Sequence, residues 1–146
     1  MNQKQPAFIV QSLDQARDAL TATRAFSCVP LILSTMGYAA ALGPAVFQAM
    51  IQALRQEFPD RPFTSAVDCG QAPGHAMAAL RCDVEGLVID GDEDAMERIR
   101  DMANQKNCMV YSPHIYEGEV LEMTSDQDMI SVCDSFLSAR YERNDA

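Results

Sequence analysis

The sequence lacks the features that would place the chain in a membrane or direct it for secretion. It contains no run of about eighteen consecutive apolar residues, the length that a membrane-spanning helix needs. Its first residues, Met1–Pro6, include no apolar segment of the kind found in a signal peptide. We therefore expect no membrane span, no membrane partner and no signal peptide.

Paired cysteines are also missing. The five cysteines are an odd number at irregular spacings, and none belongs to a Cys-x-x-Cys motif. This pattern indicates reduced thiols that pack mainly as small hydrophobic side chains, as is typical of a cytoplasmic protein. We expect a cytoplasmic location, with reduced thiols at Cys28, Cys69, Cys82, Cys108 and Cys133.

Positive charge is scarce. The chain has 11 Lys and Arg against 21 Asp and Glu, a net charge of −10. This excess argues against nucleic acid and anionic membranes as partners, and it matches a highly phosphorylated ligand poorly. Neither the GxGxxG nor the GxxxxGK[ST] phosphate motif is present. With only 2 histidines, a Ser-His-Asp triad has few ways to form.

The sequence does contain a regular alternation of short apolar runs and amphipathic segments. Near-continuous apolar strands alternating with helices are typical of a parallel sheet covered by helices. A hydrophobic content of 48% is enough for one domain with a core, so we expect a single α/β domain, 1–146, with a frayed tail at 142–146. The five expected strands are Ala7–Val10, Val29–Ser34, Phe63–Val67, Gly86–Gly91 and Cys108–Tyr111.

Helices are expected between these strands. Ser12 or Asp14 can cap the first helix, and Pro44 suits the first turn of a helix that ends near Phe58. Two further helices are expected at 72–80 and 92–106. A polar loop at 112–125 then leads to a last helix, whose apolar stripe runs from Met129 to Tyr141.

The third apolar run ends in an acid, a thiol and a glycine: Asp68, Cys69 and Gly70. Carboxylates at the carboxyl ends of parallel strands are where α/β folds place reactive groups. Asp68 could be a general acid/base, or it could cap the following turn. Cys69 could be a metal ligand or a reactive thiol, or a buried and inert side chain.

Other polar residues fall near the same edge of the expected sheet. Asp90 ends the fourth run, where it could line a pocket with Asp68 or cap the turn before Gly91. His75 and His114 are candidate metal ligands, although each could equally be a surface residue. An anion could be held by backbone N–H groups of a small loop made of Ser34, Thr35 and Gly37 together with Gly70.

The order of these segments resembles the class II, metal-dependent fructose-bisphosphate aldolase family, and the similarity covers most of the chain. The resemblance implies a truncated and degenerate member of a family of (β/α)₈ barrels. The expected fold is therefore a partial TIM-like barrel of about five parallel βα units, an open sheet with helices mainly on one face. The similar segments are 6–15, 29–34, Gly37, 54–59, Asp68-Cys69-Gly70, 86–91, Glu117-Gly118-Glu119 and Thr124-Ser125-Asp126 with the last helix.

The resemblance also implies roles for individual residues. Asp68 holds the position of the family's acid/base, and Cys69 stands where the family has a zinc-binding histidine. A thiolate can bind zinc, but a catalytic zinc needs about three protein ligands, which here would come from Cys69, His75 and His114, with Glu117 or Glu119. Ile9 replaces a substrate-contacting asparagine of the family, and the family's other metal-binding histidines and phosphate loops have no counterpart.

Three functions are compatible with these residues. The first is a pseudoenzyme: an aldolase-like domain without lyase activity that acts by binding a sugar phosphate or a protein partner. The second is an active zinc-dependent ketose-bisphosphate aldolase, an aldehyde-lyase of carbohydrate metabolism with Asp68 as acid/base. The third is a thiol enzyme or redox sensor built on Cys69. The loss of the metal histidine and the change at Ile9 favour the first.

The expected sheet also suggests a partner. Sequential right-handed crossovers place every helix on one face and leave the apolar residues of the other face open. An exposed apolar face of that size marks an association surface. Either two chains pair through it as a homodimer, or the chain forms a doubly wound sheet with helices on both faces. We expect the homodimer.

Overall fold

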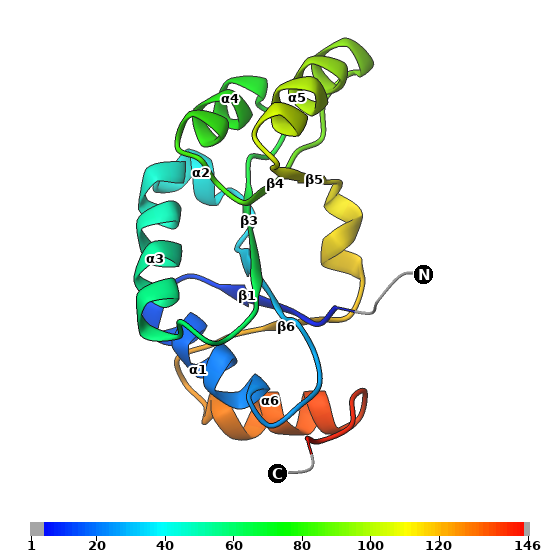
Figure 1. The fold of residues 1–146 in the computed structure, drawn as a ribbon. Coiled ribbons are helices and arrows are strands. Elements are labelled where there is room, and N and C mark those ends of the chain that lie inside the picture. Colours follow the sequence, from blue (N-terminus) through cyan, green and yellow to red (C-terminus); the bar gives the residue numbers. More distant parts are fainter. Residues whose placement is uncertain (1–4, 145–146) are drawn as a thin grey trace.

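The computed structural model describes residues 5–144, and it confirms an α/β fold built on a parallel sheet (Figure 1). Every strand pair is parallel, and the sheet has the order β5-β4-β3-β2-β1-β6. The six strands are β1 (Ala7–Val10), β2 (Leu31–Ser34), β3 (Thr64–Asp68), β4 (Gly86–Val88), β5 (Met109–Tyr111) and β6 (Val120–Glu122).

Helices α1 and α3 begin at the expected signals, whereas α2 and the 3₁₀ helix lie where loops were expected. Ser12 accepts a hydrogen bond from the backbone N–H of Gln15, and Pro44 lies in the first turn of its helix. None of the helices within residues 5–144 has the length and apolar character needed to span a bilayer. The helices are α1 (Leu13–Thr23), α2 (Tyr38–Ala41), α3 (Pro44–Glu57), α4 (Pro73–Arg81), α5 (Glu93–Gln105), α6 (Met129–Ser138) and the 3₁₀ helix η1 (Pro113–Glu117).

The main core lies between the sheet and the α-helices. Figure 1 shows α1, α3 and α4 along one side of the sheet, with η1 on the other side. Side chains alternate between the two faces of a strand, so Phe8 and Val10 of β1 belong to the main core while Ala7 and Ile9 belong to a second cluster. Because all six strands are parallel, their carboxyl ends lie at one edge of this well-packed sheet.

Residues 112–125 form more than the polar loop that the sequence predicts. They contain η1 and the sixth strand, β6, which pairs with β1 through Ala7–Val120, Phe8–Leu121 and Ile9–Glu122. The prediction of five strands was wrong because β6 has only three residues and no alternating pattern. Its pairing with β1 is distant in the sequence, so no local signal marks it as a strand.

The chain itself covers the second face of the sheet. This inner face consists of Ala7, Leu31, Leu33, Ala66 and Val88, all at most 3% exposed, and Ile115 and Tyr116 of the η1 segment pack against it. The open apolar face from which the homodimer was expected is therefore not present in residues 5–144, because the connection from β5 to β6 crosses it.

The end of the chain is also better held than the sequence indicates. Arg143 forms an antiparallel bridge with Phe26, and its guanidinium lies 2.7 Å from the carboxylate of Asp134. The backbone N–H of Asn144 donates to the carbonyl of Ala25 at 2.8 Å. Residues 142–144 of the tail that was expected to be frayed thus make defined contacts, and 145–146 lie outside the described residues.

Candidate functional site

Asp68, Ser34 and Gly37 meet at the carboxyl ends of β2 and β3. The Asp68 carboxylate accepts a hydrogen bond from the backbone N–H of Gly37 at 2.6 Å. The backbone N–H of Asp68 donates to the Ser34 hydroxyl at 2.8 Å. Asp68 is only 6% exposed. Its carboxylate therefore fixes the loop that follows β2, and the Gly37 N–H is already engaged.

Asp90 and Gly70 lie together one strand further along the edge. The backbone N–H of Asp90 donates to the Gly70 carbonyl at 2.9 Å, while the Asp90 side chain is exposed. Gly70 has φ +61° and Gly37 has φ +80°, a left-handed conformation that side chains rarely adopt. Both glycines are thus explained by tight turns after β2 and β3.

A cavity of about 320 Å³ opens at this edge, and neither Asp68 nor Asp90 is among its lining residues. The Tyr116 hydroxyl donates to the Ser34 carbonyl at 2.7 Å, which ties η1 to the end of β2. This carboxyl-edge pocket is lined by Ile9 of β1, Thr35 and Met36 of the β2–α2 loop, Tyr116 of η1 and Glu122 of β6. Sequence reasoning singled out Ile9 and Thr35 but missed Tyr116, Met36 and Glu122. The one available signal was the pair Ile115-Tyr116, an aliphatic and an aromatic side chain in a largely polar segment.

Burial and a neighbouring charge determine the protonation state of the Tyr116 hydroxyl. Burial raises the pKa of its hydroxyl well above the ordinary value, and the nearby Asp68 carboxylate raises it further. The hydroxyl is thus protonated at neutral pH and acts as a hydrogen-bond donor.

Cys69 faces away from this pocket. Its side chain is 2% exposed and belongs to the main core between sheet and helices. Burial raises the pKa of its thiol to about 12, with further contributions from the charges of Asp68 and Cys108. Since the thiolate is the form that attacks electrophiles and binds metals, Cys69 is held in its inactive form.

The two histidines do not join Cys69. His75 is partly buried on α4, and His114 is exposed on η1, where its Nδ1 lies 2.9 Å from Glu117 Oε2. This hydrogen bond raises the pKa of His114 above its ordinary value. Glu119 instead accepts from the Tyr141 hydroxyl at 3.3 Å. Across residues 5–144, no three His, Cys, Asp or Glu side chains gather closely enough to hold a metal ion. The implied zinc ligands therefore do not fit a zinc site.

The carboxyl edge is strongly acidic. The segments that follow the strands, 11–12, 35–37, 69–72, 89–92, 112–119 and 123–128, contain no Lys or Arg. They carry acids at Asp90, Asp92, Glu117, Asp126 and Asp128, whereas Glu119 lies at the opposite, amino edge, where its carbonyl accepts from the backbone N–H of Ala7. An anion at this edge would find no Lys or Arg in these segments and would be repelled by their carboxylates.

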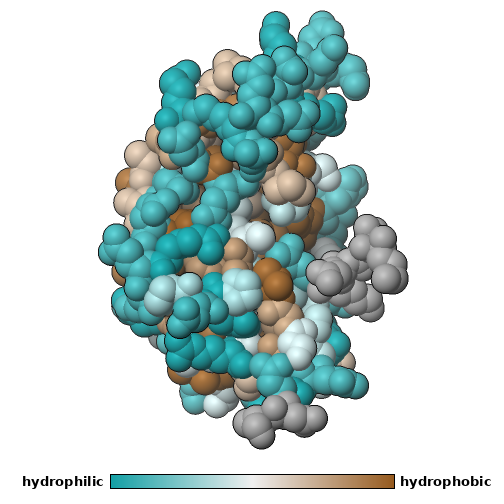
Figure 2. Space-filling model, viewed as in Figure 1, coloured by the Kyte–Doolittle hydropathy of each residue, from teal (hydrophilic) through white to brown (hydrophobic). Residues whose placement is uncertain are grey.

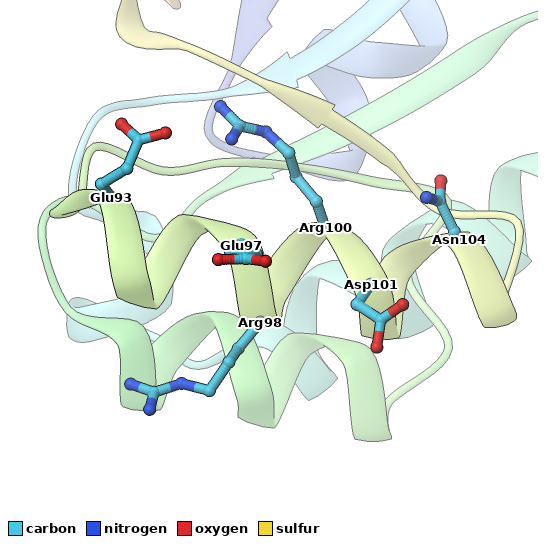
Figure 3. A pocket seen from close by; sticks show the side chains of 6 residues that line it. All are labelled: Glu93, Glu97, Arg98, Arg100, Asp101 and Asn104. Atoms are coloured by element: carbon cyan, nitrogen blue, oxygen red, sulfur yellow. The ribbon is translucent and has the colours of Figure 1, made fainter.

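A larger depression of about 550 Å³ lies elsewhere, on the surface of α5 (Figure 3). All of its lining residues come from this one helix, and Arg98 and Arg100 point in opposite directions. Because its charged groups do not converge, this depression does not form a site. The residues drawn are Glu93, Glu97, Arg98, Arg100, Asp101 and Asn104.

Comparison of the chain with protein-family models gives no match. Comparison with curated proteins gives no match either.

Proposed function

We propose that the chain is a non-catalytic binding domain whose site is the carboxyl-edge pocket. The position of Asp68 carries this proposal. A general acid/base must reach a substrate proton within hydrogen-bond distance, whereas the Asp68 carboxylate is buried and engaged by the Gly37 N–H at 2.6 Å. The zinc-lyase hypothesis lacks a converging donor set, and the thiol hypothesis lacks a thiolate at Cys69.

We also infer that the sheet is the curved sheet of a partial (β/α)₈ barrel. The sequential order of β1 to β5 supports this inference. So does the short connection 112–119, which joins the two edge strands β5 and β6. Five strand spacings across a flat sheet amount to about 24 Å, whereas a segment that is mostly 3₁₀ helix spans about 20 Å at most. Curvature brings the two edges within its reach.

The pocket favours a small organic cation with an apolar body. Ile9 and Met36 give the pocket apolar lining residues, and Tyr116 adds an aromatic ring, a group that attracts cations. Glu122 is the charged residue of the lining, and the surrounding edge has no Lys or Arg. The same charges disfavour the sugar phosphate that the aldolase resemblance implies.

Calorimetric titration with a matched pair of probes tests this function. Choline and its neutral isostere 3,3-dimethylbutan-1-ol have the same shape and differ in charge. We expect choline to bind about fivefold more tightly, the equivalent of a cation–π and carboxylate contribution of about 1 kcal/mol. Glu122→Gln should shrink this difference, while Glu97→Gln on α5 should leave it unchanged.

Three results would overturn the proposal. Equal affinity for the two probes would show that the pocket has no preference for a cationic ligand. Tighter binding of fructose 1,6-bisphosphate than of choline would restore a sugar-phosphate site. Zinc-dependent aldol cleavage that disappears in Asp68→Asn would show that the chain is an enzyme.

A further inference from the structure

A long stretch of this acidic chain carries no charge. From Ala25 to Leu54 there is no Asp, Glu, Lys, Arg or His, although charged residues make up 22% of the sequence. Burial explains part of this stretch, because β2 and the inner side of α3 belong to the core. It does not explain the segment 36–49, where many side chains face solvent.

The exposed part of this segment is apolar. Met36 is 65% exposed, Leu42 55% and Val46 50%. They lie on α2, its flanking loops and the first turn of α3, which are held together by the edge-to-face contact of Tyr38 and Phe47 at 5.5 Å. Figure 2 shows tan and brown surface at the left margin, beside these elements. We call this the neutral surface: Met36, Ala41, Leu42, Ala45, Val46 and Ala49.

We propose that the neutral surface is where two copies of this chain associate. In a two-fold symmetric interface a surface meets its own copy, so each charge near the axis faces like charge. With a net charge of −10, most of this molecule would oppose carboxylates to carboxylates. The neutral surface avoids this repulsion and removes apolar area from water.

A second copy fits this surface better than a partner of opposite charge. A basic partner would be drawn to the acidic carboxyl edge, where Asp90, Asp92 and Glu117 lie, rather than to a surface without charge. The alanines allow two helices to approach closely, and Met36, Leu42 and Val46 supply the larger apolar side chains. This interface differs from the homodimer expected through the inner face, which η1 covers.

Analytical ultracentrifugation of the whole chain tests this interface. The wild type should be dimeric at about 10 µM. The double variant Leu42→Glu/Val46→Glu should weaken the dimer about 100-fold, because each carboxylate would be desolvated or would face its copy. The matched control is Ile130→Glu, which changes another exposed apolar residue, 44% exposed on α6, and should leave the dimer intact.

Salt dependence is a second readout. Added NaCl should tighten the wild-type dimer, since it screens the repulsion between two chains of charge −10. Circular dichroism should show that each variant is folded. If Leu42→Glu/Val46→Glu does not fold, Met36→Glu, which changes a loop residue of the same surface, replaces it. A monomeric wild type would overturn the proposal, and so would a dimer that survives the neutral-surface variants or dissociates equally in Ile130→Glu.

Discussion

At the scale of single residues, Asp68 joins three parts of the chain. Its carboxylate accepts from Gly37, and its backbone N–H donates to Ser34, so β2, β3 and the loop after β2 are fixed relative to one another. A hydrogen bond to a buried ionised group contributes about 1.5–3 kcal/mol. The residue at the expected catalytic position thus acts by positioning the Thr35–Gly37 side of the pocket.

Gly37→Ala should destabilise the protein by about 1–2 kcal/mol, because an L side chain at φ +80° is strained. No atom lies within 4 Å of the added Cβ, so the cost is conformational and not steric. Gly74→Ala is the matched control. Its Cβ also meets nothing within 4 Å, but its φ lies outside the positive range and it is part of α4, so it should stabilise by about 0.5–1 kcal/mol. Urea unfolding curves measure both, and equal effects would contradict this account of Gly37.

Cys69 should resist alkylation in the folded protein. Its thiol is buried, and a pKa of about 12 leaves almost no thiolate at pH 8. Iodoacetamide followed by mass spectrometry should label the partly exposed Cys28 and Cys82 first, and should label all five cysteines in urea. Cys69 labelling at the rate of a small free thiol at neutral pH would instead support a thiol enzyme or redox sensor.

At the scale of elements, the η1 segment distinguishes this fold from a simple alternation of strands and helices. It crosses the inner face, packs Ile115 and Tyr116 against the sheet and delivers the chain to β6 beside β1. The Tyr116 hydroxyl is its polar contact with the end of β2. One wall of the carboxyl-edge pocket therefore depends on how firmly η1 is held.

Tyr116→Phe should loosen η1 while keeping its ring in place. The change removes the 2.7 Å hydrogen bond to the Ser34 carbonyl and should cost about 1 kcal/mol of stability. Hydrogen exchange should become faster for amides of 113–122, with the amides of α3 as an internal reference. Unchanged exchange in 113–122 would show that the apolar contacts of Ile115 and Tyr116 alone hold the segment.

Local signals predicted the elements that carry them. The apolar runs of β1 to β5, the Ser12 cap and Pro44 were sufficient to place these strands and the helices α1 and α3. Because the carboxyl ends of parallel strands share one edge of the sheet, the sequence also placed Ser34, Gly37 and Asp68 at that edge. Features that depend on distant pairing were missed: β6, which exists through β1, and the pocket residues Tyr116 and Glu122, which reach the site only because η1 crosses the sheet.

At the scale of the whole molecule, charge is segregated between the two edges of the sheet. Near the amino ends of β3 and β4, Arg55 makes two hydrogen bonds to Glu85, at 2.6 and 2.9 Å, and a third to the Phe63 carbonyl. Arg61 donates to the Thr23 carbonyl. These guanidinium groups bind groups of the fold itself, while the segments that follow the strands at the carboxyl edge contain acids and His114 but no Lys or Arg. This distribution of charge supports the proposal of a cationic ligand rather than a phosphate.

Zinc content of the purified chain tests most directly whether the carboxyl edge is a binding site or a metal-dependent catalytic centre. The protein should be purified without chelators in zinc-supplemented buffer and compared with Cys69→Ser by elemental analysis. Since Cys69, His75 and His114 do not converge, we predict far less than one zinc ion per chain, with no difference between the two proteins. About one zinc ion per chain that is lost in Cys69→Ser would contradict the binding-domain proposal and restore the aldolase mechanism.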